Sequence, residues 1–96
     1  MCGIIGINSN KPVSATIINS LKKLEYRGYD SAGIATLSKG SINEIKSEGR
    51  VDKLENNSLV QSMEGTIGIG HVRWATHGSP NSINAHPHSS QNVSVV

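Results

Sequence analysis

The sequence predicts an α+β fold, and three observations support this. Short apolar runs rich in isoleucine and valine, such as residues 2–8 and 66–72, have the length and composition of strands. Between the first run and residue 28, apolar residues recur instead at the spacing of a helix. Two further strand-like runs flank Lys39-Gly40, a pair typical of a hairpin turn. The chain is therefore expected to combine a sheet with at least one helix packed on it.

The first strand is predicted at CGIIGIN, residues 2–8, and a helix follows it. Pro12 suits the first turn of that helix, because its fixed φ matches a helix and its missing N–H is not needed there. Lys22, Lys23 and Glu25 lie on the opposite side from the apolar residues of the helix, which are Val13, Ile17, Ile18, Leu21 and Leu24. Gly28 stands where a glycine commonly ends a helix.

The middle of the chain is predicted to form a hairpin and a weaker helical segment. SAGIATL and SINEIKS, residues 31–37 and 41–47, are the strands of the hairpin. In residues 51–63 a helical pattern is interrupted at Asn56-Asn57-Ser58, and the residues predicted to line it are Val51, Leu54, Leu59 and Met63. TIGIGHV, residues 66–72, is predicted to form another strand.

The segment from residue 73 to residue 88 is polar, contains two prolines and is predicted to be a long loop. Long loops in small domains are usually functional or disordered. Residues 91–96 alternate and resemble the start of a strand. Since a chain that ends inside a strand leaves an unpaired edge, we expect residues 1–96 to be an incomplete domain.

Composition and charge exclude several classes of function. Nine basic and seven acidic residues are scattered along the chain with a net charge of +2, and no basic stripe suggests a nucleic-acid partner. The densest basic group, Lys22, Lys23 and Arg27, is expected to be a solvated helix face. No apolar run approaches the roughly 18 residues of a membrane helix. A single cysteine cannot form an internal disulfide, so a cytoplasmic location is predicted.

Cys2 is the only cysteine and directly follows the initiator methionine. It is either a buried small apolar residue or, if Met1 is removed, the new terminus. In the second case one residue carries a thiol and a free α-amine, and the amine can act as the base that generates the thiolate. Gly3 would allow a substrate to approach the backbone closely.

A second candidate site is GHVRWATHG, residues 70–78. Arg73 stands at the end of the predicted strand, where its guanidinium can hold a carboxylate through two parallel hydrogen bonds. The alternative is a surface arginine paired with an acid. Trp74 is either a core anchor or a flap over a pocket, and Thr76 and His77 can bind a ligand or cap turns.

The four histidines do not predict a metal site. His71, His77, His86 and His88 lack the spacing of the established zinc patterns, and HPH alone is weak evidence. No metal and no organic cofactor is expected. The stretch LEYRGYDSAGIA, residues 24–35, is interpreted as a helix end, a tight turn and a strand start, and its residues do not by themselves reveal a site.

Four stretches in this order resemble one family: MCGIIG, LEYRGYDSAGIA, GHVRWATHG and NAHPH. They are similar to the glutaminase domain of the class II glutamine amidotransferases, which are N-terminal-nucleophile hydrolases. MCGI alone also fits amidophosphoribosyltransferases and asparagine synthetases. The runs Tyr26–Asp30 and Trp74–His77 favour the glutamine–fructose-6-phosphate aminotransferase family within this class.

The resemblance implies a fold and an activity. Residues 1–96 would be the amino-terminal portion of the glutaminase domain, with a partial αββα sandwich and without the isomerase domains. The cysteine matching Cys2 attacks the amide of glutamine, and the ammonia released serves to make glucosamine 6-phosphate from fructose 6-phosphate. Full-length members form homodimers largely through the isomerase part.

The resemblance also implies roles for individual residues. Arg73 matches the arginine that grips the glutamine carboxylate. Trp74, Thr76 and His77 match the loop that closes over the substrate. His86 matches a histidine lining the same pocket, and the residues matching those beside the nucleophile are Arg27 and Gly28.

One element of the family is missing from the sequence. The oxyanion hole of the family comes from an Asn-Gly pair, and no such dipeptide occurs here. A missing oxyanion donor costs on the order of 100- to 1,000-fold in rate. We therefore expect the 96 residues alone to lack amidotransferase turnover. Two other hypotheses are a non-catalytic remnant or binding module, and a class II amidotransferase with another acceptor.

Overall fold

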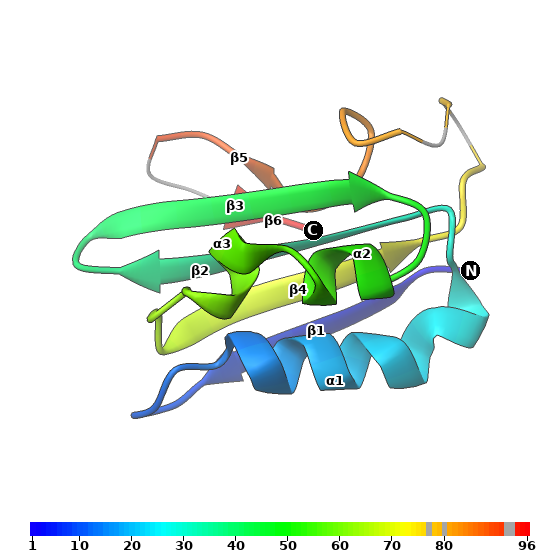
Figure 1. Cartoon of the computed structure of the whole chain (residues 1–96). Helices are drawn as coiled ribbons and strands as arrows, with labels where there is room; N and C mark the ends of the chain where they lie inside the picture. The colour runs from blue at the N-terminus through cyan, green and yellow to red at the C-terminus, as the bar shows by residue number, and fades with distance from the viewer. Residues whose placement is uncertain (77, 80, 92–93) are drawn as a thin grey trace.

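The helices and the strands of the main sheet in the computed structural model follow the order that the sequence predicts, but a short strand at His88–Ser89 begins inside the segment predicted to be a loop (Figure 1). The structure describes residues 1–76, 78–79, 81–91 and 94–96. Its elements are β1 (Gly3–Asn8), α1 (Ser14–Leu24), the 3₁₀ turn η1 (Glu25–Arg27), β2 (Ser31–Ser38), β3 (Ser41–Glu48), α2 (Asp52–Glu55), α3 (Ser58–Gln61), β4 (Ile67–Arg73), β5 (His88–Ser89) and β6 (Ser94–Val95).

The main sheet has four antiparallel strands in the order β1-β4-β2-β3. In this order β4, late in the sequence, lies between β1 and β2. Gly3 pairs with Val72, and Ser31 pairs with Arg73. The first residues of β1 and β2 therefore meet the last residues of β4 at one corner of the sheet, and this corner holds the candidate site.

The hairpin predicted around residues 39–40 is present. Strands β2 and β3 pair from Ser31↔Glu48 to Ser38↔Ser41. Lys39 and Gly40 both have positive φ, 51° and 76°. Two consecutive positive φ angles give the turn whose twist matches that of the flanking strands. The glycine adopts this conformation without a steric penalty.

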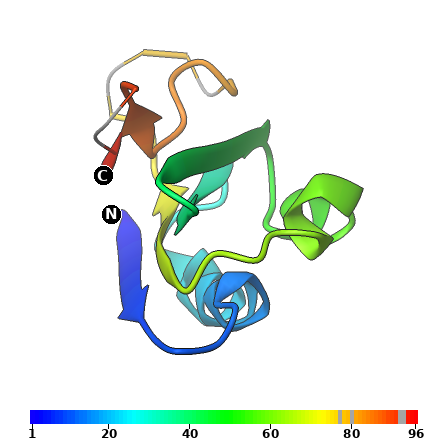
Figure 2. The same ribbon diagram turned by 90° about the vertical axis from the view of Figure 1, so that its left-hand side faces the viewer.

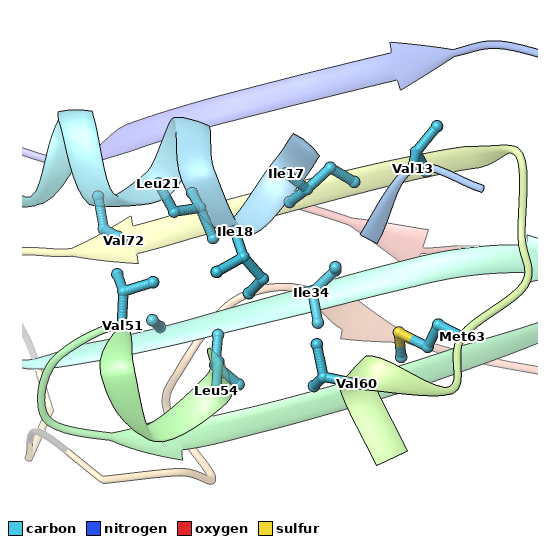
Figure 3. Close-up of a cluster of buried hydrophobic side chains, with 11 residues drawn as sticks. Val13, Ile17, Ile18, Leu21, Ile34, Val51, Leu54, Val60, Met63 and Val72 are labelled. Carbon is cyan, nitrogen blue, oxygen red and sulfur yellow. The ribbon is translucent and has the colours of Figure 1, made fainter. Parts of the chain in front are cut away.

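The helices cover one face of the sheet, and the apolar core lies between them and the sheet (Figure 3). Ile17 and Leu21 of α1 and Ile34 of β2 are fully buried in it. Burial of such side chains contributes about 1.5–3 kcal/mol each, which makes this layer the main source of stability. Lys22 and Lys23 lie on the exposed face of α1, as predicted.

Residues 51–63 form two short helices rather than one. Asn57 separates them, and its side chain accepts a hydrogen bond of 2.8 Å from the Leu59 N–H. This cap restarts the helical phase, so Val60 is buried and Leu59 is 65% exposed. The prediction that Leu59 lines the core is therefore wrong. The other residues predicted to line it are buried: Val51, Leu54 and Met63.

A second, smaller layer lies on the opposite face of the sheet, as Figure 2 shows. Strands β5 and β6 pair antiparallel there, and the Ser89 hydroxyl is hydrogen-bonded to the Glu44 carboxylate of β3. The layers are thus helix, four-stranded sheet and two-stranded sheet. This arrangement corresponds to an α+β fold with a partial αββα sandwich.

Candidate functional site

The Cys2 thiol lies at the corner where β1 begins and β4 ends. Its side chain is exposed, which excludes the buried apolar residue considered from the sequence. The Trp74 N–H donates to Cys2 Sγ at 3.5 Å, and the thiol donates to the Trp74 carbonyl oxygen at 3.9 Å. Backbone groups on both sides of Trp74 therefore contact the sulfur.

Arg27 contacts the residues on both sides of the first peptide bond. It belongs to η1, the 3₁₀ turn that continues α1 toward the site. Its Nε–H donates to the Cys2 carbonyl oxygen at 3.1 Å, and its Nη2–H donates to Met1 Sδ at 2.7 Å. The guanidinium thus ties the amino terminus to the end of the helix and leaves the Cys2 thiol exposed.

Gly28 is required for close packing and not for a left-handed helix end. Helix α1 ends at Leu24, and Gly28 caps η1 with an extended φ of 179°. A Cβ atom at this position would lie 2.5 Å from the Arg73 carbonyl carbon and 2.6 Å from the Trp74 nitrogen. The sequence pointed to a glycine for the wrong reason: the constraint comes from β4, 45 residues later in the chain.

Two small hollows lie on either side of Trp74, which is 49% exposed. One, of about 150 Å³, is lined by Tyr29, Asp30, Trp74 and Ala75. The other, of about 180 Å³, is lined by Met1, Tyr26, Arg27 and Trp74. The indole packs edge-to-face on Tyr29 with ring centroids 6.2 Å apart. Trp74 is thus at the surface between two hollows, which favours the flap over the core anchor.

A larger hollow, of about 440 Å³, lies elsewhere on the molecule. It is lined by residues of β3 and of the segment from Leu59 to Glu64. Its lining includes neither Cys2 nor a residue that is hydrogen-bonded to Cys2. Because catalysis needs reactive groups within hydrogen-bond reach, the corner at Cys2 is the better candidate in spite of its smaller hollows.

Arg73 is buried at the end of β4, with 8% of its surface exposed. Its Nη1–H donates to the Ser79 carbonyl oxygen at 3.1 Å, and the Asn84 side-chain amide donates to the same oxygen at 2.9 Å. The loop after β4 therefore folds back over the guanidinium. Burial argues against the surface arginine considered as the alternative.

Of the other loop residues predicted for the site, the structure describes Thr76 and His86 but not His77. Thr76 is described and exposed. His77 lies outside the described residues. His86 is placed by the stack of histidines described below, over β2 and β4.

Asp30 lies in the turn between η1 and β2 and is not among the site residues predicted from the sequence. Its carboxylate Oδ2 accepts a hydrogen bond from the Ala75 N–H, and Oδ1 accepts one of 3.0 Å from the Ser31 hydroxyl. Its backbone N–H donates to the Arg73 carbonyl oxygen at 3.2 Å. An aspartate two residues after Gly28 was visible in the sequence, but its partner at Ala75 was not.

Three histidines stack beside this corner. The ring centroids of His71 and His86 are 4.5 Å apart, and those of His86 and His88 are 4.6 Å apart. The backbone carbonyl of His86 packs so closely on Gly33 of β2 that a Cβ there would lie 2.0 Å from the oxygen. The segment carrying His86 and His88 thus lies directly on the sheet.

Burial, followed by the neighbouring charges of His86, Arg73 and His88, lowers the pKa of His71 from 6.5 to about 4, against an opposite effect of Asp30. Burial followed by the charges of His88, Arg73 and Lys46 also lowers the pKa of His86. Both rings are therefore neutral at pH 7. A neutral stack avoids repulsion with the Arg73 guanidinium.

The free energy of unfolding is expected to fall as the pH drops from about 6.5 to 4. In this range the unfolded chain binds a proton at His71 that the folded chain excludes, so acid favours unfolding. A pKa lowered from 6.5 to about 4 corresponds to about 3 kcal/mol at 1.36 kcal/mol per pKa unit. Urea unfolding between pH 4 and pH 7 measures this slope.

His71→Asn should flatten that pH dependence, since asparagine does not titrate. His88→Asn is the matched control, because His88 is exposed at the end of the same stack. Equal slopes for the two variants would show that His71 is not the responsible group.

Within the described ranges, no group of three or more His, Cys, Asp and Glu side chains is arranged to hold a metal ion. In the same part of the chain, no helix combines the length and apolar character needed to cross a bilayer.

Comparison with known proteins relates the chain to a group of enzymes. No family model matches the sequence. The chain is 52% identical over all its 96 residues to a glutamine–fructose-6-phosphate aminotransferase [isomerizing] of Rhizobium meliloti. It is 53% identical over 98 aligned residues to the enzyme of the same name from Clostridium acetobutylicum. Its fold matches glutamine phosphoribosylpyrophosphate amidotransferase from B. subtilis with a TM-score of 0.77, at 26% identity and over 96% of this chain.

Over nearly all of its length the chain is similar to glutamine amidotransferases. Both kinds of relative are glutamine amidotransferases, and the curated ones are those that the sequence motifs favoured. The N-terminal-nucleophile fold predicted from the resemblance is thereby confirmed. The chain spans 16% of the length of the curated relatives and 20% of the length of the B. subtilis enzyme chain.

Proposed function

We propose that Cys2, after removal of Met1, is the nucleophile that cleaves the side-chain amide of glutamine. The ammonia released would serve to make glucosamine 6-phosphate, with fructose 6-phosphate as the acceptor that the relatives' name gives. The observation that carries the proposal is the exposed thiol of the only cysteine, in contact with the Trp74 backbone at the corner of the sheet.

The chemistry needs a base next to the thiol, and removal of Met1 supplies one. The reference pKa of an α-amine is about 7.7–8.0 and that of a thiol about 8.5, so proton transfer between them is nearly balanced. The thiolate attacks the amide carbon, the C–N bond breaks, and the nitrogen leaves as ammonia with the proton from the amine. Water then cleaves the thioester and releases glutamate.

Removal of Met1 would also open space beside the nucleophile. The Met1 side chain lines the hollow of about 180 Å³ next to Trp74, and its sulfur accepts a hydrogen bond from Arg27. Removal of Met1 would release that Arg27 donor and enlarge the hollow. Arg27 would continue to orient the terminal residue through its hydrogen bond to the Cys2 carbonyl.

Arg73 is proposed to bind the α-carboxylate of glutamine. A guanidinium has five N–H donors in a planar fork that matches a carboxylate, and burial strengthens such a charge-assisted pair. Trp74, Thr76 and His77 are proposed as the flap over the bound substrate, and His86 as part of the same pocket. The exposure of Trp74 between the two hollows supports the flap.

A covalent label tests the proposal without requiring complete turnover. The reagent is a chloroketone analogue of glutamine, whose chloromethyl carbon the thiolate attacks with loss of chloride. We expect one adduct on Cys2, detected by intact-mass measurement, and protection by L-glutamine but not by D-glutamine. Equal protection by both enantiomers, or labelling that glutamine does not slow, would contradict the proposal.

Arg73→Gln is expected to raise the concentration of chloroketone that gives half-maximal labelling by about 10- to 100-fold, the value of a charge-assisted pair. The half-maximal concentration for Arg73→Lys should lie between those of Arg73→Gln and the wild type, because lysine keeps the charge but lacks the planar pair of N–H donors. Lys23→Gln, on the exposed face of α1, is the control for loss of charge. A half-maximal concentration unchanged in folded Arg73→Gln would exclude the carboxylate-binding role.

A further inference from the structure

We infer that Asp30 is a positioning residue for the Cys2 nucleophile, acting through the peptide group that joins Trp74 to Ala75. This inference rests on the proposed function, because the position of the thiol matters to a reaction only if the thiol reacts. It adds a residue that the sequence analysis assigned to a turn.

The peptide group between Trp74 and Ala75 links Asp30 to Cys2. The Trp74 carbonyl and the Ala75 N–H belong to one planar unit and point in opposite directions. The Ala75 N–H donates to the Asp30 carboxylate, and the Trp74 carbonyl oxygen accepts from the Cys2 thiol at 3.9 Å. Asp30 and Cys2 therefore hold the two ends of the same rigid group.

The hydrogen bonds at the two ends of this peptide group are not equally strong. A thiol is a weak donor, so its contact cannot by itself fix the orientation of the peptide group. A hydrogen bond from an N–H to a carboxylate is charge-assisted and about twice as strong as a neutral one. The orientation of the Trp74–Ala75 peptide is therefore set from the Asp30 side.

Asp30 is itself held firmly. Its N–H donates to the Arg73 carbonyl oxygen at 3.2 Å, and its carbonyl accepts from the Gly49 N–H at 2.8 Å. The Ser31 hydroxyl donates to the second carboxylate oxygen at 3.0 Å. The carboxylate is thus anchored to β2, β4 and the segment after β3 before it contacts Ala75.

The sheet explains why a side chain is needed here. The register of β2 with β4 ends at Ser31↔Arg73, so no strand residue pairs with the backbone beyond Arg73. The Ala75 N–H would then lack a ladder partner, and the carboxylate takes that place. The Asp30 carboxylate thereby extends the hydrogen bonding of the sheet by one peptide group. This is the peptide group whose carbonyl oxygen contacts the Cys2 thiol.

The test uses protein from which Met1 has been removed, as verified by intact mass, and has two independent measurements. The first is the χ1 distribution of Cys2 from three-bond NMR couplings, which does not depend on glutamine. The second is the rate of inactivation by the chloroketone, separated into its maximal rate and its half-saturating concentration. The variants are Asp30→Ala and Asp30→Asn, with Asp52→Ala on the exposed start of α2 as the control.

We expect Asp30→Ala to spread Cys2 over several rotamers and to lower the maximal inactivation rate by about 10- to 100-fold, since small misplacements have effects of this size. The half-saturating concentration should stay unchanged. Asp30→Asn keeps a carbonyl oxygen for the Ala75 N–H and should recover most of the rate. Asp52→Ala should behave as the wild type.

The outcomes separate this inference from the proposed function. A wild type that does not react with the chloroketone, together with a Cys2 rotamer that depends on Asp30, overturns the proposed function and shows only that Asp30 sets the orientation of the thiol. A wild type that reacts, with Asp30→Ala keeping both the rotamer and the maximal rate, overturns the positioning role alone. The role is also overturned if the rate falls only in proportion to the unfolded fraction measured by circular dichroism.

Discussion

A protein with serine in place of Cys2 is expected to lose chloroketone labelling almost completely, by a factor on the order of 10⁴ or more. The reactive species is the thiolate, and a serine hydroxyl is far less acidic, so the adjacent amine cannot ionise it to a comparable extent. Because Cys2 is exposed and outside the core, the thermal unfolding midpoint should stay within about 2 °C of the wild type.

Labelling followed by intact-mass measurement checks the loss, and thermal unfolding by circular dichroism checks the fold. A second variant tests the amine separately. Inserting a lysine between Met1 and Cys2 keeps the thiol but moves the free α-amine off the cysteine residue. Its labelling rate should fall well below that of the processed protein, and full labelling of this variant would exclude the amine as base.

Gly28→Ala is expected to have the largest effect on both stability and labelling among the substitutions outside Cys2. Its Cβ would lie 2.5–2.6 Å from the Arg73 carbonyl group and the Trp74 nitrogen, all of them backbone atoms that cannot rotate away. Overpacking typically costs about 1–3 kcal/mol. The backbone must move apart at the peptide whose N–H donates to Cys2 Sγ, so labelling of the folded fraction should fall as well.

Gly6→Ala is the matched control, since it places the same methyl group on another glycine of the sheet, in β1 opposite Ile69. Its Cβ would meet only Ile69 Cγ2, at an ordinary contact distance of 3.9 Å. We expect Gly6→Ala to match or exceed the wild type in urea unfolding, because alanine reduces the entropy of the unfolded chain. If Gly28→Ala proved as stable as Gly6→Ala, the close approach of the two segments would not exist in solution.

Local sequence patterns predicted the elements well where the conformation depends on residues close together in the sequence. The run of β-branched residues in β1, the helical spacing of Ile17 and Leu21, and the turn at Gly40 depend on neighbours in sequence. The phase of residues 58–63 was mistaken because a side-chain cap at Asn57 interrupts the helix, and a cap changes which side chains face the core.

The candidate site was predicted in its parts but not in its assembly. Cys2 was singled out by its position, and Arg73 by its place at the end of a strand. From the sequence, His71 was considered only as a metal ligand and His86 also as part of the substrate pocket, whereas the structure stacks the two rings and lowers the pKa of both. Burial drives these shifts, and the burial of a histidine cannot be seen in the sequence around it.

The sequence by itself determined the strands of the main sheet, the main helix, the single thiol after the initiator methionine and the motifs that resemble the amidotransferases. Only the tertiary structure decided that Cys2, Asp30 and the backbone of Trp74 meet at one corner. The reason is the strand order β1-β4-β2, which brings together residues about 30 to 70 positions apart through backbone pairing. Such pairing depends on which strands become neighbours, and no local pattern of side chains records that choice.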